Sequence, residues 1–525
     1  MTNFVVAFYL LFQATTGSEQ GPVKPDDTDR GARRVDSFRQ EDLDALLRKV
    51  DGLEAELKEL RKVSPHPAEK GTSPDPQSSG QTPPPNAKND GAKPNPQDSD
   101  EAKKKQLEEE FRKALGDEKA APNLAAPVSS GMPIGGGASL KLIDIAFDLL
   151  ATGGTSTATE DEIRLLEAGG HDPKNRGFTL QNAELTFSGV VDPYLRGDAN
   201  IVLQIDDTGA TTIELEEAYL TTLEFPFNLQ LKAGQFFNAF GRMNATHPHT
   251  WDFVDQPVII GRVLGTDGYR APGAQMAWLT PLPFFAELTG SVQNSQGDTA
   301  PYFRGVPGDV VAGRTLVTRP VRNLGDMVYL IRLKTSFDPT EEITIVPGLS
   351  ALFGPNATDL DNHTEVYGVD FYLKWKPLAN DQGWPFVGWQ TEAIMRRYAA
   401  AAVVTGGGAQ IDRERNLDDW GMYSQVVWGF SRPWTAGVRV DYARGQEDSF
   451  SNGSYTSLGD AFRDQRGRAS TELTYYPSEF SKVRIQYNYD RSTFLTRAPF
   501  GDLKDAHSIY IQFEILFGAH GAHKF

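Results

Sequence analysis

Apolar and polar side chains alternate with a period of two in segment after segment from about residue 139 to the C-terminus. In the last segment, the odd-numbered positions from Ile509 to Phe517 are all Ile or Phe, and Tyr510, Gln512 and Glu514 separate them. The same alternation recurs at 483–489, 367–375, 329–333 and 199–205. Segments of about ten residues with one apolar and one polar face are typical of strands that cross a membrane around a wet lumen. The pattern therefore predicts an all-β fold, a transmembrane antiparallel β-barrel.

The connections between these segments support the same fold. Short turns lie at 191–194, 224–227, 281–283, 338–340, 431–433 and 476–478. Longer polar, Gly-rich connections lie at 152–176, 240–264, 294–324, 355–364, 400–417, 445–463 and 491–504. Segments from 139–151 to 505–518 give about 16 strands, and an even number places both chain ends on the periplasmic side. A large soluble β protein, the main alternative, should have shorter strands and less consistently charged polar faces.

The composition of the chain excludes several kinds of site and partner. The 525-residue chain has no cysteine, which excludes disulfides, Cys-ligated zinc and Cys nucleophiles. The net charge of −18 argues against nucleic acid as a partner, because nucleic acids bind basic faces. No run of eighteen apolar residues offers a helical membrane span.

The region before the barrel differs in character. Residues 1–17 have a short apolar core followed by small and polar residues, which predicts a signal peptide. In 36–62, apolar residues spaced by three and four predict a coiled coil, with a lone amphipathic helix as the alternative. The stretch 63–138 is a Pro/Gly-rich linker, predicted to be disordered apart from a short helix at 101–115. The barrel domain is expected at 139–525.

Two stretches resemble a known group of outer-membrane proteins. The strand pair 214–220 and 231–242 resembles the early barrel of phosphate-selective-type porins, where an acidic strand with an Ala-Tyr pair precedes a Gly-Gln-Phe strand. The stretches 244–257 and 518–525 resemble a porin-like subgroup often labelled zinc-regulated TonB-dependent outer membrane receptors. The resemblance implies an outer-membrane location, contact with membrane lipid, a homo-trimer and a periplasmic N-terminal coil.

The alternation also predicts which charged side chains line the pore. By position they are Glu184, Arg196, Asp198, Glu214, Glu216, Lys232, Arg332, Lys334, Asp370, Lys374, Arg396, Arg439, Asp441, Glu472, Arg484 and Glu514. The two signs nearly balance along the wall. A mixed wall favours a general diffusion pore or a polar-solute channel over a strong anion filter.

One connection carries candidate metal ligands. His247 and His249 form an H-x-H pair at 247–249, with Asp252 and Asp255 nearby, and such a set could bind Zn²⁺ or another divalent ion. The alternative is a loop shaped by Pro and His that folds into the pore, where Trp251 and Phe253 pack on the wall. Neither a G-x-S-x-G nor an H-E-x-x-H motif occurs, so we expect no enzyme, and no cofactor is indicated.

The sequence thus predicts a porin-like channel for the diffusion of small hydrophilic solutes or ions. Two alternatives remain open. The barrel could be an outer-membrane metal (zinc) uptake receptor, or it could tether the outer membrane to the cell wall through an N-terminal segment that contacts peptidoglycan.

Overall fold

A computed structural model describes residues 132–134, 138–140, 143–205, 209–404, 410–445, 450–451, 454–455, 463–496 and 505–518. These residues belong to one compact unit, Ala120–Phe525. The predicted signal peptide at 1–17, the coiled coil at 36–62 and the helix at 101–115 lie outside the described residues, as does most of the linker.

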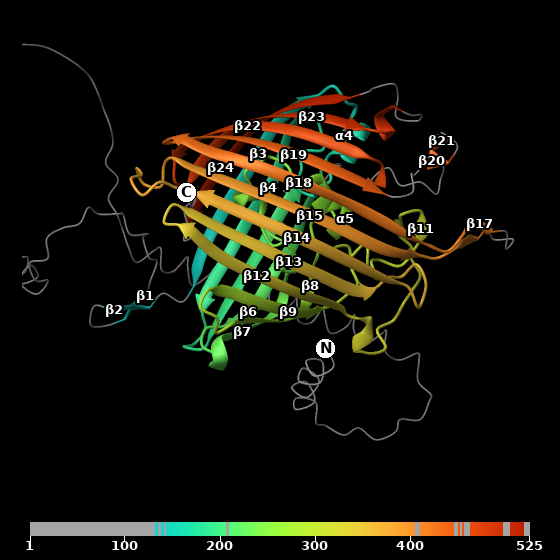
Figure 1. Ribbon diagram of the computed structural model, residues 1–525, viewed down its shortest axis with the longest axis horizontal. Coiled ribbons are helices and arrows are strands. Elements are labelled where there is room, and N and C mark those ends of the chain that lie inside the picture. The colour runs from blue at the N-terminus through green and yellow to red at the C-terminus, as the bar shows by residue number, and fades with distance from the viewer. Residues whose placement is uncertain are drawn as a thin grey trace, which may run out of the picture. The chain divides into compact units, whose positions relative to one another are not determined.

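Sixteen antiparallel strands close into a barrel (Figure 1). In chain order they are β3 (Asp144–Ser156), β4 (Gly177–Val190), β5 (Leu195–Ile205), β6 (Thr211–Thr222), β7 (Leu229–Phe237), β8 (Arg270–Leu279), β9 (Phe285–Gln293), β12 (Val328–Thr340), β13 (Ile343–Pro355), β14 (His363–Trp375), β15 (Phe386–Ala400), β18 (Arg415–Ser431), β19 (Trp434–Gly445), β22 (Arg466–Ser478), β23 (Ser481–Ser492) and β24 (Ala506–Gly518). Chain neighbours pair with each other, and β24 pairs with β3 to close the ring. The prediction of an antiparallel barrel of about 16 strands is confirmed.

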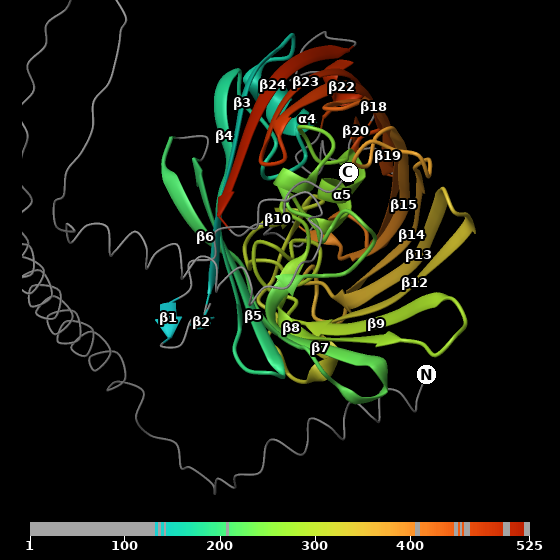
Figure 2. The ribbon, with the colours of Figure 1, turned by 90° about the vertical axis from the view of Figure 1, so that its left-hand side faces the viewer.

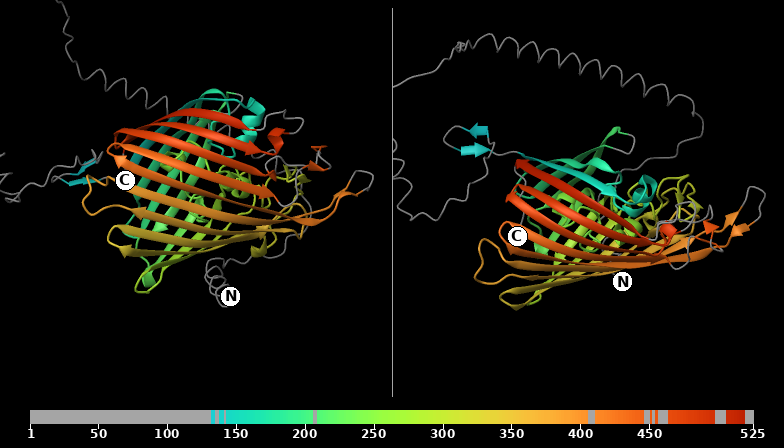
Figure 3. Two further views of the ribbon diagram at one scale, coloured as in Figure 1. Left: turned by 45° about the horizontal axis from the view of Figure 1, so that its top comes forward. Right: turned by 90° about the horizontal axis from the view of Figure 1, so that it is seen from above.

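The barrel begins slightly later than the alternation suggested. Its first strand starts at Asp144, whereas Ala138–Leu140 forms β2 of a separate hairpin with β1 (Met132–Ile134). Connections at one end of the barrel are tight, and those at the other end are mostly long (Figure 3).

Short elements occupy the connections. They are α4 (Glu160–Leu166), η1 (Pro226–Asn228), η2 (Pro248–Thr250), α5 (Val258–Leu264), β10 (Val310–Val311), β11 (Arg314–Thr315), η3 (Leu324–Asp326), β16 (Val403–Val404), β17 (Gln410–Asp412), β20 (Phe450–Ser451), β21 (Ser454–Tyr455) and η5 (Phe494–Thr496). The helix α4 starts with a capping box, in which Thr159 and Glu162 bond each other's backbone N–H groups. Among the described residues, no helix combines the length and the apolar character needed to cross a membrane.

The two faces of each strand meet different surroundings, as β24 illustrates. The outward side chains of Ile509, Ile511 and Phe513 are 50%, 41% and 50% exposed, whereas the inward side chains of Gln512 and Glu514 are buried. In a soluble protein the apolar face would be covered and the charged face exposed. An apolar outer face around a polar interior is instead typical of a barrel whose outer face contacts membrane lipid.

The interior is not empty. Residues 238–269, which connect β7 to β8 and are called the crossing loop below, run through the barrel, and Figure 2 shows α5 inside the ring of strands. All seven residues of α5 are buried, because its sequence Val-Ile-Ile-Gly-Arg-Val-Leu is apolar on nearly every side. The helix packs against β15, β18 and β19, where Ile259 and Val263 join a core with Ile394 and Tyr423.

Candidate functional site

The wall of the barrel fixes the path of the crossing loop mainly through the loop's backbone. Wall side chains donate to its carbonyls, or accept from its N–H groups, at successive positions. These bonds are Met243 N–H to Glu392 (2.8 Å), Lys482 to His249 C=O (2.6 Å), Arg484 to Trp251 C=O (2.9 Å), Val254 N–H to Gln486 (2.7 Å), Val258 N–H to Asp441 (3.1 Å) and Arg396 to Arg262 C=O (2.9 Å). The loop therefore follows a defined route from β15 to β23 and back past β19 to β15.

Two aromatic side chains of the crossing loop pack on the wall. Trp251 is buried in the core that surrounds α5, and Phe253 packs with Trp384 and Phe386. Arg439 lies over the Phe253 ring, 4.7 Å from its centroid. This arrangement matches the prediction of a loop folded into the pore.

A buried carboxylate anchors the middle of the crossing loop. Asp255 Oδ1 lies 2.5 Å from Arg439 Nη2, and Asp255 Oδ2 lies 2.6 Å from Arg468 Nη1. Gln486 and Asn488 donate further hydrogen bonds to the same carboxylate. Burial alone would raise the pKa of Asp255, but the two guanidiniums hold that pKa below its usual range.

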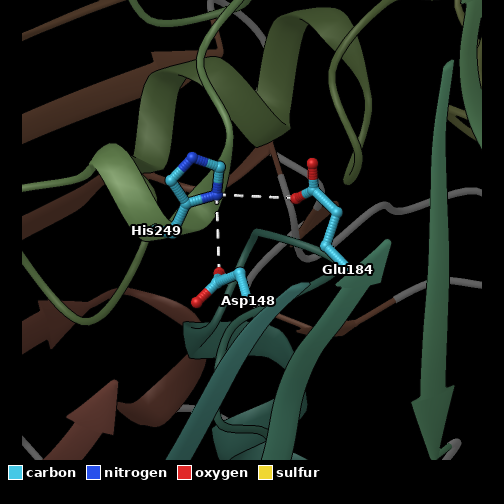
Figure 4. Close-up of side chains that lie close together, drawn as sticks. All are labelled: Asp148, Glu184 and His249. Carbon is cyan, nitrogen blue, oxygen red and sulfur yellow. Dashed lines mark ion pairs between the residues drawn. The ribbon is translucent and has the colours of Figure 1, made fainter. Parts of the chain in front are cut away.

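Further round the wall, beyond β24, histidines of two connections meet carboxylates of three strands. We call the set the histidine–carboxylate cluster; its members are Asp148 on β3, Glu184 on β4, Glu216 and Glu217 on β6, His171 before β4, and His247 and His249 of the crossing loop. Figure 4 shows the His249 ring facing Asp148 and Glu184, which come from neighbouring strands.

The distances in the histidine–carboxylate cluster are short. His247 Nδ1 lies 2.9 Å from Glu216 Oε2 and 3.4 Å from Glu184 Oε2, and His247 Nε2 lies 3.1 Å from Glu217 Oε2. His249 Nδ1 lies 3.5 Å from both Asp148 Oδ2 and Glu184 Oε2. The two predicted ligands, His247 and His249, stack with ring centroids 5.7 Å apart. The structure therefore brings them together with four carboxylates.

A β-bulge explains how two consecutive glutamates reach the same interior. Asn200 of β5 pairs with Glu217 and Ile201 pairs with Leu215, so Glu216 is an extra residue in β6. The extra residue breaks the alternation locally, and both Glu216 and Glu217 are buried. A strict period of two would have turned Glu217 toward the outside.

The electrostatics of the histidine–carboxylate cluster differ from the rest of the lumen. Within the described residues, the ion pairs of Asp148, Glu184, Glu216 and Glu217 are all with histidines. Burial would lower the pKa of His247, but Glu216 and Glu184 raise that pKa well above its ordinary value. Asp370, Asp419 and Asp441, in contrast, pair with arginine.

Ten of the sixteen predicted pore residues are buried in the described structure. They are Glu184, Glu216, Arg332, Asp370, Arg396, Arg439, Asp441, Glu472, Arg484 and Glu514. Several of them pair with one another, as Arg332 does with Asp370 at 2.7 Å and Arg439 with Asp441 at 2.8 Å. These charged side chains thus form contacts within the wall and with the crossing loop.

The other six predicted pore residues are at least partly exposed. They are Arg196, Asp198, Glu214, Lys232, Lys334 and Lys374. Arg196 pairs with Asp198 at 2.9 Å, Lys334 with Glu287 at 2.8 Å, and Glu214 with Arg270. Lys232 and Lys374 instead lie over aromatic rings, those of Tyr219 at 4.2 Å and Phe386 at 5.2 Å.

Sequence reasoning missed three members of these sites, Asp148, Glu217 and His171. Asp148 alternates with Phe147 and Leu149, so the period of two could have placed it in the lumen. Glu217 was hidden by the bulge. His171 lies in a connection, where alternation gives no direction, and no local pattern marks it. Asp255 was predicted as a candidate metal ligand beside the H-x-H pair, but the structure places its carboxylate between Arg439 and Arg468.

The fold and these sites define a class, a closed 16-stranded β-barrel of membrane-spanning type whose lumen is crossed by one long connection. No protein-family model matches the chain. An uncharacterized protein of Aquifex aeolicus is 29% identical over 373 residues, which cover 68% of this chain and 73% of that protein.

Solved structures of outer-membrane proteins are similar at low sequence identity. The outer membrane channel DcaP of Acinetobacter baumannii is 12% identical, with a TM-score of 0.45 over 74% of this chain and 99% of that one. An anion-selective porin from Comamonas acidovorans is 6% identical, with a TM-score of 0.41 over 71% and 99%.

Proposed function

We propose that the protein is a porin-like channel of the outer membrane that passes small hydrophilic solutes or ions through a lumen narrowed by the crossing loop. The observation that carries this proposal is the route of the loop through a barrel whose inner face is polar and whose outer face is apolar. A barrel of 16 strands is wide enough for an aqueous channel, and an inward loop reduces its width.

The partly exposed luminal side chains indicate where solutes would pass. Lys232 on β7, Lys334 on β12 and Lys374 on β14 lie on one arc of the wall, from β7 to β14, away from the buried charges of β22–β24. Within the described residues, Lys232 and Lys374 form no ion pair with a carboxylate, so their charges act on the lumen. We infer a modest preference for anions, which is weaker than a dedicated phosphate filter would give.

The proposal is tested by conductance of the purified, refolded full chain in planar bilayers. Because the chain has no cysteine, one introduced cysteine is its only thiol. We expect a charged, water-soluble thiol reagent to reduce the current through Lys334→Cys. The matched control is Val369→Cys, whose side chain points outward and is 52% exposed, and its current should not change. The absence of stable conductance would contradict the proposal.

The remaining features follow from the resemblance and stay proposals. We propose that the protein is a homo-trimer in contact with membrane lipid and that its N-terminal segment is periplasmic. We also propose that it belongs to the phosphate-selective-type porins or to the zinc-regulated subgroup. Light scattering of the detergent-solubilised protein tests the trimer. Deleting residues 18–100, which lie outside the described residues, and measuring co-sedimentation with peptidoglycan tests whether the N-terminal segment tethers the barrel to the cell wall.

A further inference from the structure

The histidine–carboxylate cluster combines two kinds of metal ligand in a buried place. Its members Asp148, Glu184 and His249 bring one potential ligand atom each to within 4.8 Å of one another, and so do Glu184, Glu216 and His247. Glu184 belongs to both groups. We propose that the cluster binds divalent metal ions at two adjacent positions that share Glu184, and that the ions fix the crossing loop to the wall of the barrel.

Three of the four histidine–carboxylate distances in the two groups fit an ion better than a direct hydrogen bond; the fourth, from His247 Nδ1 to Glu216 Oε2, is 2.9 Å. A charge-assisted N–H···O bond is about 2.7–2.9 Å long. Two ligands at about 2.1 Å from one tetrahedral ion lie roughly 3.4 Å apart. His249 Nδ1 is 3.5 Å from Asp148 Oδ2 and from Glu184 Oε2, and His247 Nδ1 is 3.4 Å from Glu184 Oε2.

Burial without hydrogen-bond partners is a second, independent observation. Asp148 is 1% exposed, and neither of its carboxylate oxygens accepts a hydrogen bond of normal geometry from a described residue. The same holds for Glu216 Oε2. Burying a carboxylate whose oxygens lack well-formed hydrogen bonds costs free energy, and coordination of a metal is one of the few ways to offset that cost.

The ligand types select the class of ion. Each position offers one imidazole nitrogen and two carboxylate oxygens, and three protein ligands leave room for water. Imidazole favours Zn²⁺ and neighbouring transition metals, whereas Ca²⁺ and Mg²⁺ favour sites made only of oxygen. A Zn²⁺-like ion therefore fits this set best.

Because the ligands come from two different parts of the chain, a bound ion would have a structural effect. His247 and His249 come from the crossing loop, whereas Asp148, Glu184 and Glu216 come from the wall strands β3, β4 and β6. An ion bound by both sets cross-links the loop to the wall. Metal binding should therefore stabilise the loop in its observed path, a property that goes beyond the channel function and is measured without it.

The test is Zn²⁺ titration of the folded full chain by calorimetry, after removal of metal with a chelator. We expect the wild type to bind two ions. Glu184→Gln should weaken both positions at least 10- to 100-fold. Asp148→Asn and Glu216→Gln should each leave one position intact, because each removes a ligand of one group only.

A matched control is the exposed pair His363 and Glu365, whose Nε2 and Oε1 atoms are 3.4 Å apart. The variants His363→Ala and Glu365→Gln should bind Zn²⁺ like the wild type. If Glu184→Gln binds Zn²⁺ as tightly as these controls do, the proposal is wrong. A preference for Ca²⁺ over Zn²⁺ would overturn the assigned class of ion.

Folding of each variant is checked by its β-sheet circular dichroism, and His249→Ala replaces any variant that does not fold. Hydrogen exchange tests the cross-link separately. Zn²⁺ should slow the exchange of backbone amides in 243–256 in the wild type and in Glu365→Gln, but not in Glu184→Gln. Equal exchange with and without Zn²⁺ in the wild type would contradict the cross-link.

Discussion

The Asp255 carboxylate of the crossing loop lies 2.5 Å from the Arg439 guanidinium of β19, and neither side chain is exposed to solvent. Arg439 also donates to the Asp255 backbone carbonyl at 2.8 Å. One wall side chain thus holds both the charge and the backbone of the loop at its centre. The stability of the loop should depend on this pair more than on any surface ion pair.

We expect Asp255→Asn to loosen the crossing loop. Removing one partner of a buried ion pair costs about 3–5 kcal/mol, because the other charge stays buried. That cost corresponds to roughly 100-fold faster hydrogen exchange, or more, in 250–260. The control is Asp161→Asn, which removes an exposed pair with Arg164 and should change exchange little. Equal exchange in both variants would show that the pair does not hold the loop.

The pH dependence of the same anchor follows from the lowered pKa of Asp255. In the unfolded chain the carboxyl has a pKa of about 3.9. A lowered folded pKa gives stability that is fully present above about pH 4 and is lost as the pH falls through the folded pKa. Loop protection in the wild type relative to Asp255→Asn should therefore be constant from pH 7 to pH 5 and shrink below pH 4. A difference that already vanishes at pH 6 would contradict this assignment.

Reversing the charge of Lys232 or Lys374 should move ion selectivity toward cations. Each lysine lies over an aromatic ring and has no carboxylate partner among the described residues. A unit charge at 4 Å in water is worth about 1 kcal/mol, so a severalfold change in the permeability ratio is expected. Reversal potentials in a salt gradient measure this ratio. Arg397→Glu, on the outer face of β15, makes the same charge change and should have no effect.

Gly241 should not tolerate a side chain. Its φ of 62° lies in the left-handed region, and an added Cβ would clash with Glu392 Oε2. Glu392 accepts the N–H groups of Arg242 and Met243, so a displaced carboxylate would release the start of the crossing loop.

We therefore expect Gly241→Ala to raise single-channel conductance and to increase its noise. Gly290→Ala is the control, because the nearest neighbour of its added Cβ, the Leu330 carbonyl oxygen, is 3.8 Å away and its φ is not in the left-handed region. Unchanged conductance in Gly241→Ala would mean that the loop start tolerates the displacement.

The barrel could be predicted from the sequence because lipid and lumen impose opposite polarity on alternate residues. The strand Ala506–Gly518 shows this directly, since its sequence pattern and its exposure pattern coincide. The packing of Trp251 and Phe253 on the wall could be predicted for a related reason. Large apolar residues in a polar connection are usually buried in a core.

The histidine–carboxylate cluster could be predicted only in part from the sequence. His247 and His249 stand out by their spacing, but their partners are distant in sequence and one depends on a bulge that breaks the period of two. Trp384 shows the same limit. Its position beside a strand gives no sign of burial, yet the structure buries it beside Phe386, where the crossing loop brings Phe253.

The crossing loop is held mostly by its own carbonyl and N–H groups, which every residue type except proline supplies in full. Apart from Asp255, the two histidines and the buried apolar residues, the side chains that it carries can therefore change without altering its route through the lumen. Relatives of this protein could exchange those side chains, and with them the size and charge of what passes, while the barrel and the route stay the same. Variation in cargo could then arise within about 30 residues, and the residues to compare first are the wall donors and acceptors such as Lys482, Arg484 and Gln486.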